Sequence, residues 1–278
     1  MTRSVAELTD YFIADAPDTN WASRLNEARR AHRAQDRAVL AAALTTRDPR
    51  PIPDDVLADL ETLLSDERNA RGTVNASDLP SLVEEGVAAL PYGDRVSLWK
   101  GDLTRLSADA IVNAANDRML GCFTPGHACI DNAIHAAAGP RLRQECADYM
   151  RRKGTREPTG RAVVTRGYCL PAAHVIHTVG PIVTGALTDS DRGLLAQSYR
   201  SILDAAHAHP DITTVGLCSI STGVFGFPKG PAAEICLATV ADWFEKHPTS
   251  DLRLIISLFA DVDATAYLQA LHSFGRSS

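Results

Sequence analysis

One apolar run near the middle of the chain sets the expected architecture: Ala110-Ile111-Val112-Asn113-Ala114-Ala115, followed by Asn116. Its length and its β-branched residues predict a buried strand. Further apolar runs that predict strands lie at residues 96–99, 161–165, 173–178, 214–220 and 252–258. Stretches with helical spacing lie among them, at residues 132–149, 194–208, 231–246 and 264–274. Buried strands that alternate with helices are typical of an α/β sandwich with a mixed sheet.

The N-terminal part of the chain differs in composition from the rest. Residues 1–75 are rich in Ala, Arg, Leu and Asp, and their apolar residues fall at helical spacing, with one long Ala/Arg stretch at residues 21–44. Prolines at positions 49, 51 and 53 must interrupt the helices there. We therefore expect a small helical extension of about three helices over residues 1–75, a linker over 76–93 and an α/β unit over 94–278.

Composition excludes some classes of function. The net charge of −6 disfavours general nucleic-acid binding, which needs a basic surface. No apolar run reaches membrane-spanning length, and the start shows no secretory signal. Four cysteines stand singly in apolar segments and are expected to be buried free thiols, which suits the cytoplasm: Cys146, Cys169, Cys218 and Cys236.

Two polar motifs follow predicted strands. In Lys100-Gly101-Asp102-Leu103-Thr104, Asp102 either caps a turn or accepts a hydrogen bond from an exocyclic amine such as that of adenine. Asn116 stands at the end of the strand formed by residues 110–115, where polar site residues of open α/β sheets usually lie. An asparagine-assisted turn explains this second motif about equally well.

A third motif combines three potential metal ligands. Cys122, His127 and Cys129 fall within eight residues, in a loop whose Pro125 and Gly126 suit a tight turn. Two thiolates and one imidazole form a plausible zinc set, and three protein ligands leave the open position of a catalytic site. The alternative is a pair of free thiols and a loop histidine.

A fourth motif follows the predicted strand at residues 214–220 and leads into a helix: Ser221-Thr222-Gly223-Val224-Phe225-Gly226-Phe227-Pro228. Its glycines expose backbone N–H groups near a helix N-terminus, as in a phosphate cradle. It matches neither a Walker loop nor a dinucleotide fingerprint. A Gly/Pro-rich connector is the competing interpretation.

In this order, the motifs resemble the macrodomain family. The resemblance covers about residues 94–275 and rests on Gly-Asp-Leu-Thr, Asn-Ala-Ala-Asn, the run from Asp131 to Gly139 and the run from Ser221 to Pro228. Many members carry glycines where this chain has Cys122 to Cys129, so the chain looks like the zinc-containing branch, whose members also carry an N-terminal helical extension. The resemblance implies an α/β/α sandwich.

The resemblance also implies a ligand, ADP-ribose, and roles for particular residues. Asp102 and Leu103 would hold the adenine, and Asn116 would contact the distal ribose. The diphosphate would lie on the segment formed by Ser221, Thr222, Gly223, Val224 and Phe225.

The implied activity is zinc-dependent removal of mono-ADP-ribose from modified proteins. Asp131 and Asn116 would be the catalytic residues, acting where the glycosidic bond at the distal ribose breaks, with Zn²⁺ held by Cys122, His127 and Cys129. An N-terminal helix position would favour the ionised form of Asp131, although a simple helix cap would also explain an aspartate there. The alternatives are a reader module that binds ADP-ribose without catalysis and an O-acetyl-ADP-ribose deacetylase.

Overall fold

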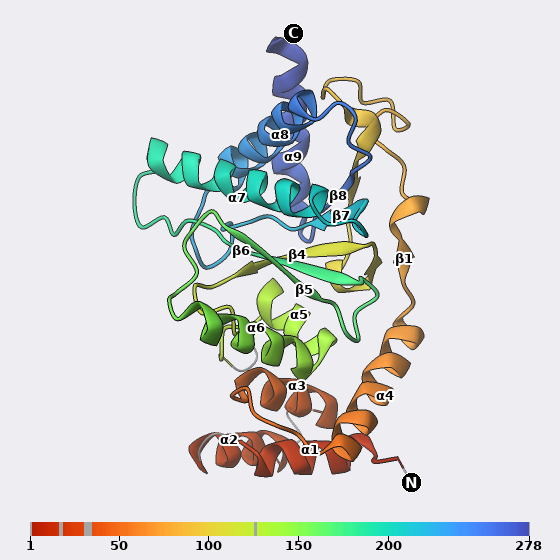
Figure 1. The fold of residues 1–278 in the computed structure, drawn as a ribbon, viewed down its shortest axis with the longest axis vertical. Helices are drawn as coiled ribbons and strands as arrows, with labels where there is room; N and C mark the ends of the chain where they lie inside the picture. Colours follow the sequence, from red (N-terminus) through yellow and green to blue (C-terminus); the bar gives the residue numbers. More distant parts are fainter. Residues whose placement is uncertain (1, 17–18, 31–34, 125–126, 278) are drawn as a thin grey trace.

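The computed structural model describes residues 2–16, 19–30, 35–124 and 127–277 (Figure 1). Its α-helices are α1 (Val5–Ala14), α2 (Thr19–Arg30), α3 (Asp36–Thr46), α4 (Asp54–Arg71), α5 (Ile130–Ala138), α6 (Pro140–Lys153), α7 (Asp189–His207), α8 (Lys229–Lys246) and α9 (Asp261–Ser277). The strands are β1 (Val74–Asn75), β2 (Val96–Trp99), β3 (Leu106–Ser107), β4 (Ala110–Ala115), β5 (Ala162–Arg166), β6 (His174–Val179), β7 (Thr214–Leu217) and β8 (Arg253–Ser257).

Six strands form the main sheet in the order β2-β8-β7-β4-β6-β5. All neighbouring pairs are parallel except β5 and β6, which run antiparallel. Asn113 of β4 pairs in register with His177 of β6. Because β4 and β7 are neighbours, the segments that follow them leave the sheet side by side at its carboxyl edge.

Helices cover both faces of the sheet. In Figure 1, α7, α8 and α9 lie on one face, and α5 and α6 lie on the other. The N-terminal helices α1, α2 and α3 form a further layer beyond α5 and α6. The architecture is therefore the α/β/α sandwich with a mixed sheet, preceded by N-terminal helices, that the sequence predicts.

The N-terminal helices have their own apolar cluster. Leu8, Phe12, Leu40 and Leu60 are among its fully buried members, and Cys169 from the loop after β5 joins it. The helix expected over residues 21–44 is not continuous, because Gln35 has an extended backbone and α3 begins after it. Residues 31–34 of that stretch lie outside the described residues.

Two other sequence expectations need correction. The helix expected over residues 132–149 is two helices, because Gly139 adopts a positive φ of 82° and Pro140 starts a new helix. The segment expected to be a linker, residues 76–93, is packed: Ala76, Leu82 and Leu90 are buried in the main core. Just before it, β1 pairs with β3. None of the helices in the described ranges has the length and apolar character needed to cross a membrane.

Candidate active site

A cavity of about 460 Å³ opens at the carboxyl edge of the parallel strands. Its walls come from the segments that follow β2, β4, β7 and β8, together with the first turn of α5 and the loop before it. Every site residue predicted from the sequence lines this one cavity: Asp102, Leu103, Asn116, Cys122, His127, Cys129, Asp131, Ser221, Thr222, Gly223, Val224 and Phe225. The fold therefore brings all four motifs together.

Asp102 follows β2 and takes the first of the two roles that the sequence left open, that of a cap. Its Oδ1 accepts hydrogen bonds from the Thr104 backbone N–H at 2.9 Å and from the Thr104 hydroxyl at 2.7 Å, so it caps a short 3₁₀ helix at Leu103–Arg105. Within the described chain, Oδ2 accepts no hydrogen bond. The carboxylate is thus held rigidly by one oxygen while the residue lines the cavity.

The segment 219–228, after β7, is shaped by its backbone. Ser221 adopts a left-handed φ of 64°, and the Phe227 N–H donates back to the Ser221 carbonyl at 3.0 Å. Phe227 is buried and anchors the segment, whereas Val224 is 74% exposed. Within the described residues, the N–H groups from Thr222 to Phe225 donate to no protein acceptor. Four such donors beside the cavity suit an anionic ligand.

Two asparagines, one within β4 and one just after it, hold the Asp131 side chain in place. Asn113 donates from Nδ2 to Asp131 Oδ1 at 2.8 Å and also lies 3.1 Å from His177 Nδ1. Asn116 donates from Nδ2 to the Gly121 carbonyl at 2.8 Å, and the same nitrogen lies 3.4 Å from Asp131 Oδ2. Both carboxylate oxygens are therefore oriented by the sheet.

Asp131 is only 4% exposed, at the second position of α5. It is not the helix cap, because Cys129 takes that place: the Cys129 Sγ accepts from the Asn132 N–H at 3.4 Å. Burial raises the pKa of Asp131 to about 6, although the Asn113 hydrogen bond and the Arg143 charge both lower it. The helix position suggested from the sequence favours the ionised form of Asp131, but loss of solvent has the larger effect and disfavours it.

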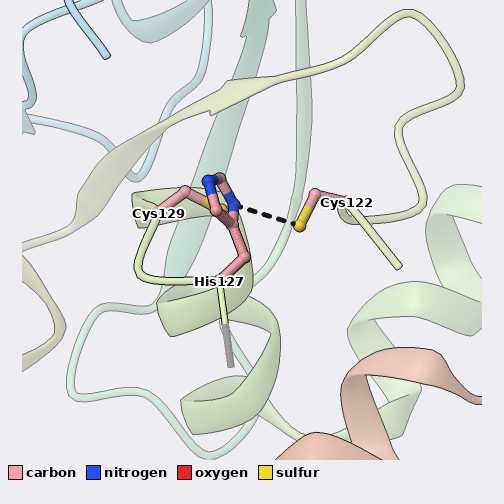
Figure 2. A group of neighbouring side chains, drawn as sticks. All are labelled: Cys122, His127 and Cys129. Carbon is pink, nitrogen blue, oxygen red and sulfur yellow. Dashed lines mark hydrogen bonds between the residues drawn. The ribbon is translucent and has the colours of Figure 1, made fainter. Parts of the chain in front are cut away.

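Cys122, His127 and Cys129 converge on one another, as Figure 2 shows. Their ligand atoms lie within 4.8 Å of one another, and Cys122 Sγ is 3.4 Å from His127 Nδ1. Burial raises the pKa of the Cys129 thiol to about 12, with the neighbouring Cys122 and Asp131 adding to the rise. Metal binding at this thiol must therefore release a proton. Pro125 and Gly126, expected to form a tight turn here, lie outside the described residues.

The three side chains fit a zinc ion. Zinc binds sulfur at about 2.3 Å and nitrogen at about 2.0 Å in a tetrahedron, which places neighbouring ligand atoms about 3.5 Å apart. The distance between Cys122 and His127 already has that size. All three ligands line the cavity, so the fourth coordination position would face a bound ligand.

Several residues to which the sequence assigned no role also contribute to the site. Asn132 braces the metal-ligand loop by accepting from the Cys122 N–H at 3.3 Å and donating to the Thr124 carbonyl at 3.1 Å. Near the Asp102 end, Lys229 pairs with Asp263 and Phe259 is 78% exposed at the rim. His177 supports Asn113 from the neighbouring strand and does not line the cavity.

The arrangement defines a class of protein. It is an α/β/α sandwich with a cavity at the carboxyl edge of its sheet. The cavity is lined by Asp102 after β2, by free amides after β7 and by Asp131 beside β4, and β8 and β7 lie between β2 and β4 in the sheet. Such a cavity suits a ligand with a hydrogen-bond donor at one end, phosphates in the middle and a reacting group at the other end.

Sequence comparison identifies the family. The macro domain pattern matches residues 112–236. The chain is 41% identical over 233 residues to a protein-ADP-ribose hydrolase of Treponema medium, a match that covers 84% of this chain and 86% of the relative. It is 40% identical over 227 residues to a protein-ADP-ribose hydrolase of Staphylococcus aureus, covering 81% of each chain. The chain belongs to the macro domain family.

Solved structures of macrodomains support the same family assignment. A Trypanosoma brucei macrodomain in complex with ADP-ribose matches with a TM-score of 0.62 at 31% identity, covering 80% of this chain and 91% of that one. An Oceanobacillus iheyensis macrodomain with ADP matches with a TM-score of 0.59 at 33% identity, covering 66% of this chain and 93% of that one.

Proposed function

We propose that this chain is a zinc-dependent hydrolase that removes mono-ADP-ribose from modified proteins by cleaving the glycosidic bond at the distal ribose. The observation that carries the proposal is the position of Asp131. A buried carboxylate that two asparagines orient lines the same cavity as three converging side chains that could hold a metal ion. A module that only binds needs neither feature.

ADP-ribose would bind along the cavity from Asp102 to Asp131. Asp102 Oδ2 accepts from the adenine amine, and Leu103 supports the base. The N–H groups of residues 222–225 hold the diphosphate. Asn116 contacts the distal ribose, whose C1″ carbon then lies beside Asp131.

Asp131 acts on the attacking water. The bond between C1″ and the acceptor atom breaks, its electron pair leaves with the acceptor, and the water oxygen bonds to C1″. Asp131 orients that water and takes one of its protons. A carboxylate with a pKa of about 6 is ionised at neutral pH and is a stronger base than an ordinary aspartate.

Cys122, His127 and Cys129 would hold the zinc. A bound zinc ion supplies Lewis-acid polarisation of an oxygen atom that reaches its open position. The residues that would hold it and Asp131 belong to one loop and the helix turn that follows it, so both groups would act on the same end of a bound ligand.

The relatives support the proposal. The curated relatives from Treponema medium and Staphylococcus aureus are protein-ADP-ribose hydrolases, and the chain covers more than four fifths of their length. The Trypanosoma brucei macrodomain was solved in complex with ADP-ribose.

The direct test is release of ADP-ribose from a mono-ADP-ribosylated protein, measured with native protein, with chelator-treated protein and after zinc is restored. We expect release, loss of release and recovery. Binding of ADP-ribose without release would identify a reader instead. Release that survives complete zinc removal would rule out the metal's role.

A further inference from the structure

Arg143 of α6 connects the N-terminal helices to the sandwich. Its side chain is buried, and Nη1 donates to the carbonyls of Leu44 at 3.1 Å, Thr45 at 2.9 Å and Arg47 at 2.9 Å. These carbonyls lie at the C-terminal end of α3, where the helix carries partial negative charge. The guanidinium therefore fixes the end of α3 against α6.

The same guanidinium contacts both residues that flank Cys122. It lies over the Phe123 ring, 4.7 Å from the centroid. It also packs against Gly121 so closely that a Cβ there would lie 2.6 Å from Nη2. Gly121 has a positive φ of 81° and accepts the Asn116 hydrogen bond, so its position is constrained from two sides.

A small cavity of about 10 Å³ lies beside Arg143, at the boundary between the two helical layers. It is lined by Arg47, His135 and Arg143, among others. Arg143 Nη2 and both ring nitrogens of His135 are buried there without a hydrogen-bond partner among the described residues. A cavity of this size has room for about one water molecule, which could satisfy these groups.

The contacts continue to Asp131. His135 Nε2 lies 3.5 Å from Asp131 Oδ1, one helical turn away on α5. Burial lowers the pKa of His135 well below its ordinary value, so the ring is neutral. Arg143 thus stands at the centre of a group that joins α3, the flanks of Cys122 and the turn that carries Asp131.

We propose that Arg143 is the positioning residue through which α3 holds segment 121–123, and with it the Cys122 thiol, in place beside Asp131. The inference rests on the proposed function only where it concerns the metal. It connects the N-terminal helices to the geometry of the site, although none of their described residues lines the large cavity.

The chain offers a matched control for the alternative that Arg143 has only a structural role. Arg68 of α4 also joins the N-terminal helices to the sandwich, because its Nη1 donates to the Cys169 carbonyl at 3.2 Å. Within the described parts of the chain, Arg68 makes no hydrogen bond with segment 121–123. If Arg143 only strengthens the junction, removing either arginine should have the same kind of effect.

The experiment compares Arg143→Met, Arg143→Lys and Arg68→Met in the full-length chain, with folding checked by thermal unfolding. The first readout is the rate at which iodoacetamide alkylates Cys122 in chelator-treated protein, followed by mass spectrometry. The second is zinc affinity, measured by competition with a chelating dye. Neither readout depends on turnover.

We expect Arg143→Met to raise the alkylation rate of Cys122 and to lower zinc affinity, each by about tenfold, the usual scale for groups that orient metal ligands. Arg143→Lys keeps the charge but loses the planar stacking on Phe123, so both changes should persist in smaller form. Arg68→Met should lower the unfolding temperature and leave both readouts at wild-type values.

Equal effects of Arg143→Met and Arg68→Met would overturn the inference, as would a folded Arg143→Met protein with unchanged readouts. If Arg143→Met does not fold, the Arg143→Lys variant tests the inference instead. Wild-type alkylation rate and zinc affinity in Arg143→Lys would also overturn it. A wild-type protein that binds no zinc would defeat the proposed function, while the alkylation rates would still test Arg143.

Discussion

Asn113 donates a hydrogen bond to Asp131 Oδ1 over 2.8 Å, and the two residues are separated by 18 positions in the chain. The bond links the central strand β4 to the first turn of α5. Asn113 in turn lies beside His177 of β6, its register partner. A residue in the middle of the sheet thus fixes the carboxylate that the proposed reaction uses.

Replacing Asp131 by Asn should abolish most turnover. The amide keeps an oxygen to accept from Asn113 but cannot take a proton, so we expect a loss of about a hundredfold or more. Because Cys129 caps the helix, the helix start should be unaffected. Single-turnover release from mono-ADP-ribosylated protein measures the loss, with ADP-ribose affinity and zinc content as controls. Wild-type turnover would remove Asp131 from the mechanism.

The same variant should be more stable than wild type at neutral and basic pH. The folded-state pKa of Asp131 is about 6, above the ordinary aspartate value of 3.8, so its ionisation opposes folding as the pH rises. The difference corresponds to about 3 kcal/mol. Thermal or urea unfolding should show the full gain above about pH 6, fading towards pH 4. A gain that does not depend on pH would contradict the burial of charge at Asp131.

Zinc retention should depend on the sulfur of Cys129 and not on its role as a cap. Serine is a good helix N-cap, so Cys129→Ser should preserve α5 while removing a thiolate ligand. We expect about one zinc per wild-type chain and little in the variant, measured by elemental analysis. Cys169→Ser, which alters a buried thiol outside the cavity, is the matched control and should keep its zinc.

Asp102→Asn separates the two tasks of Asp102. The amide oxygen can still cap the 3₁₀ helix, as Oδ1 does now, but the acceptor Oδ2 becomes an NH₂ donor. ADP-ribose affinity measured by calorimetry should fall by about 1–3 kcal/mol, because an adenine amine would then face a donor. Unchanged affinity together with an unchanged unfolding temperature would place the adenine elsewhere.

Gly180→Ala should displace residues 221–225, the segment that is proposed to hold the diphosphate. A Cβ at Gly180 would lie 2.1 Å from Ser221 Oγ and 2.6 Å from Ile220 Cγ2. The overpacking should displace Ser221 and weaken ADP-ribose binding by about 1–3 kcal/mol. Gly193→Ala, in α7 with open space around it, should bind like wild type. Equal affinities for both variants would show that the segment tolerates movement.

The α/β sandwich with a mixed sheet could be predicted from the sequence because its signals are local, whereas the α/β/α layering and the roles of Leu103 and Asp131 came from the family resemblance. Strand ends followed by Gly, Asn or Asp are visible in short windows, and parallel strands bring their carboxyl ends together. The helix break at Gly139 was equally local but was masked by continuous helical spacing on both sides.

The supporting residues could not be predicted because their partners are distant in the chain. Arg143 looks like any arginine of an exposed helix face until α3, almost 100 positions earlier, supplies its carbonyl partners. The raised pKa of Asp131 likewise depends on complete burial by several elements. Helix position alone suggested the opposite sign.

Cys129 is both a proposed zinc ligand and the cap of α5, and this overlap has an evolutionary consequence. A single nucleotide change converts a cysteine codon into a serine codon. Because serine caps a helix well, that change would cost little stability while removing a metal ligand. Among descendants of such a chain, a metal-free macro domain that still binds ADP-ribose is therefore one mutation away, with no intervening unstable form to select against.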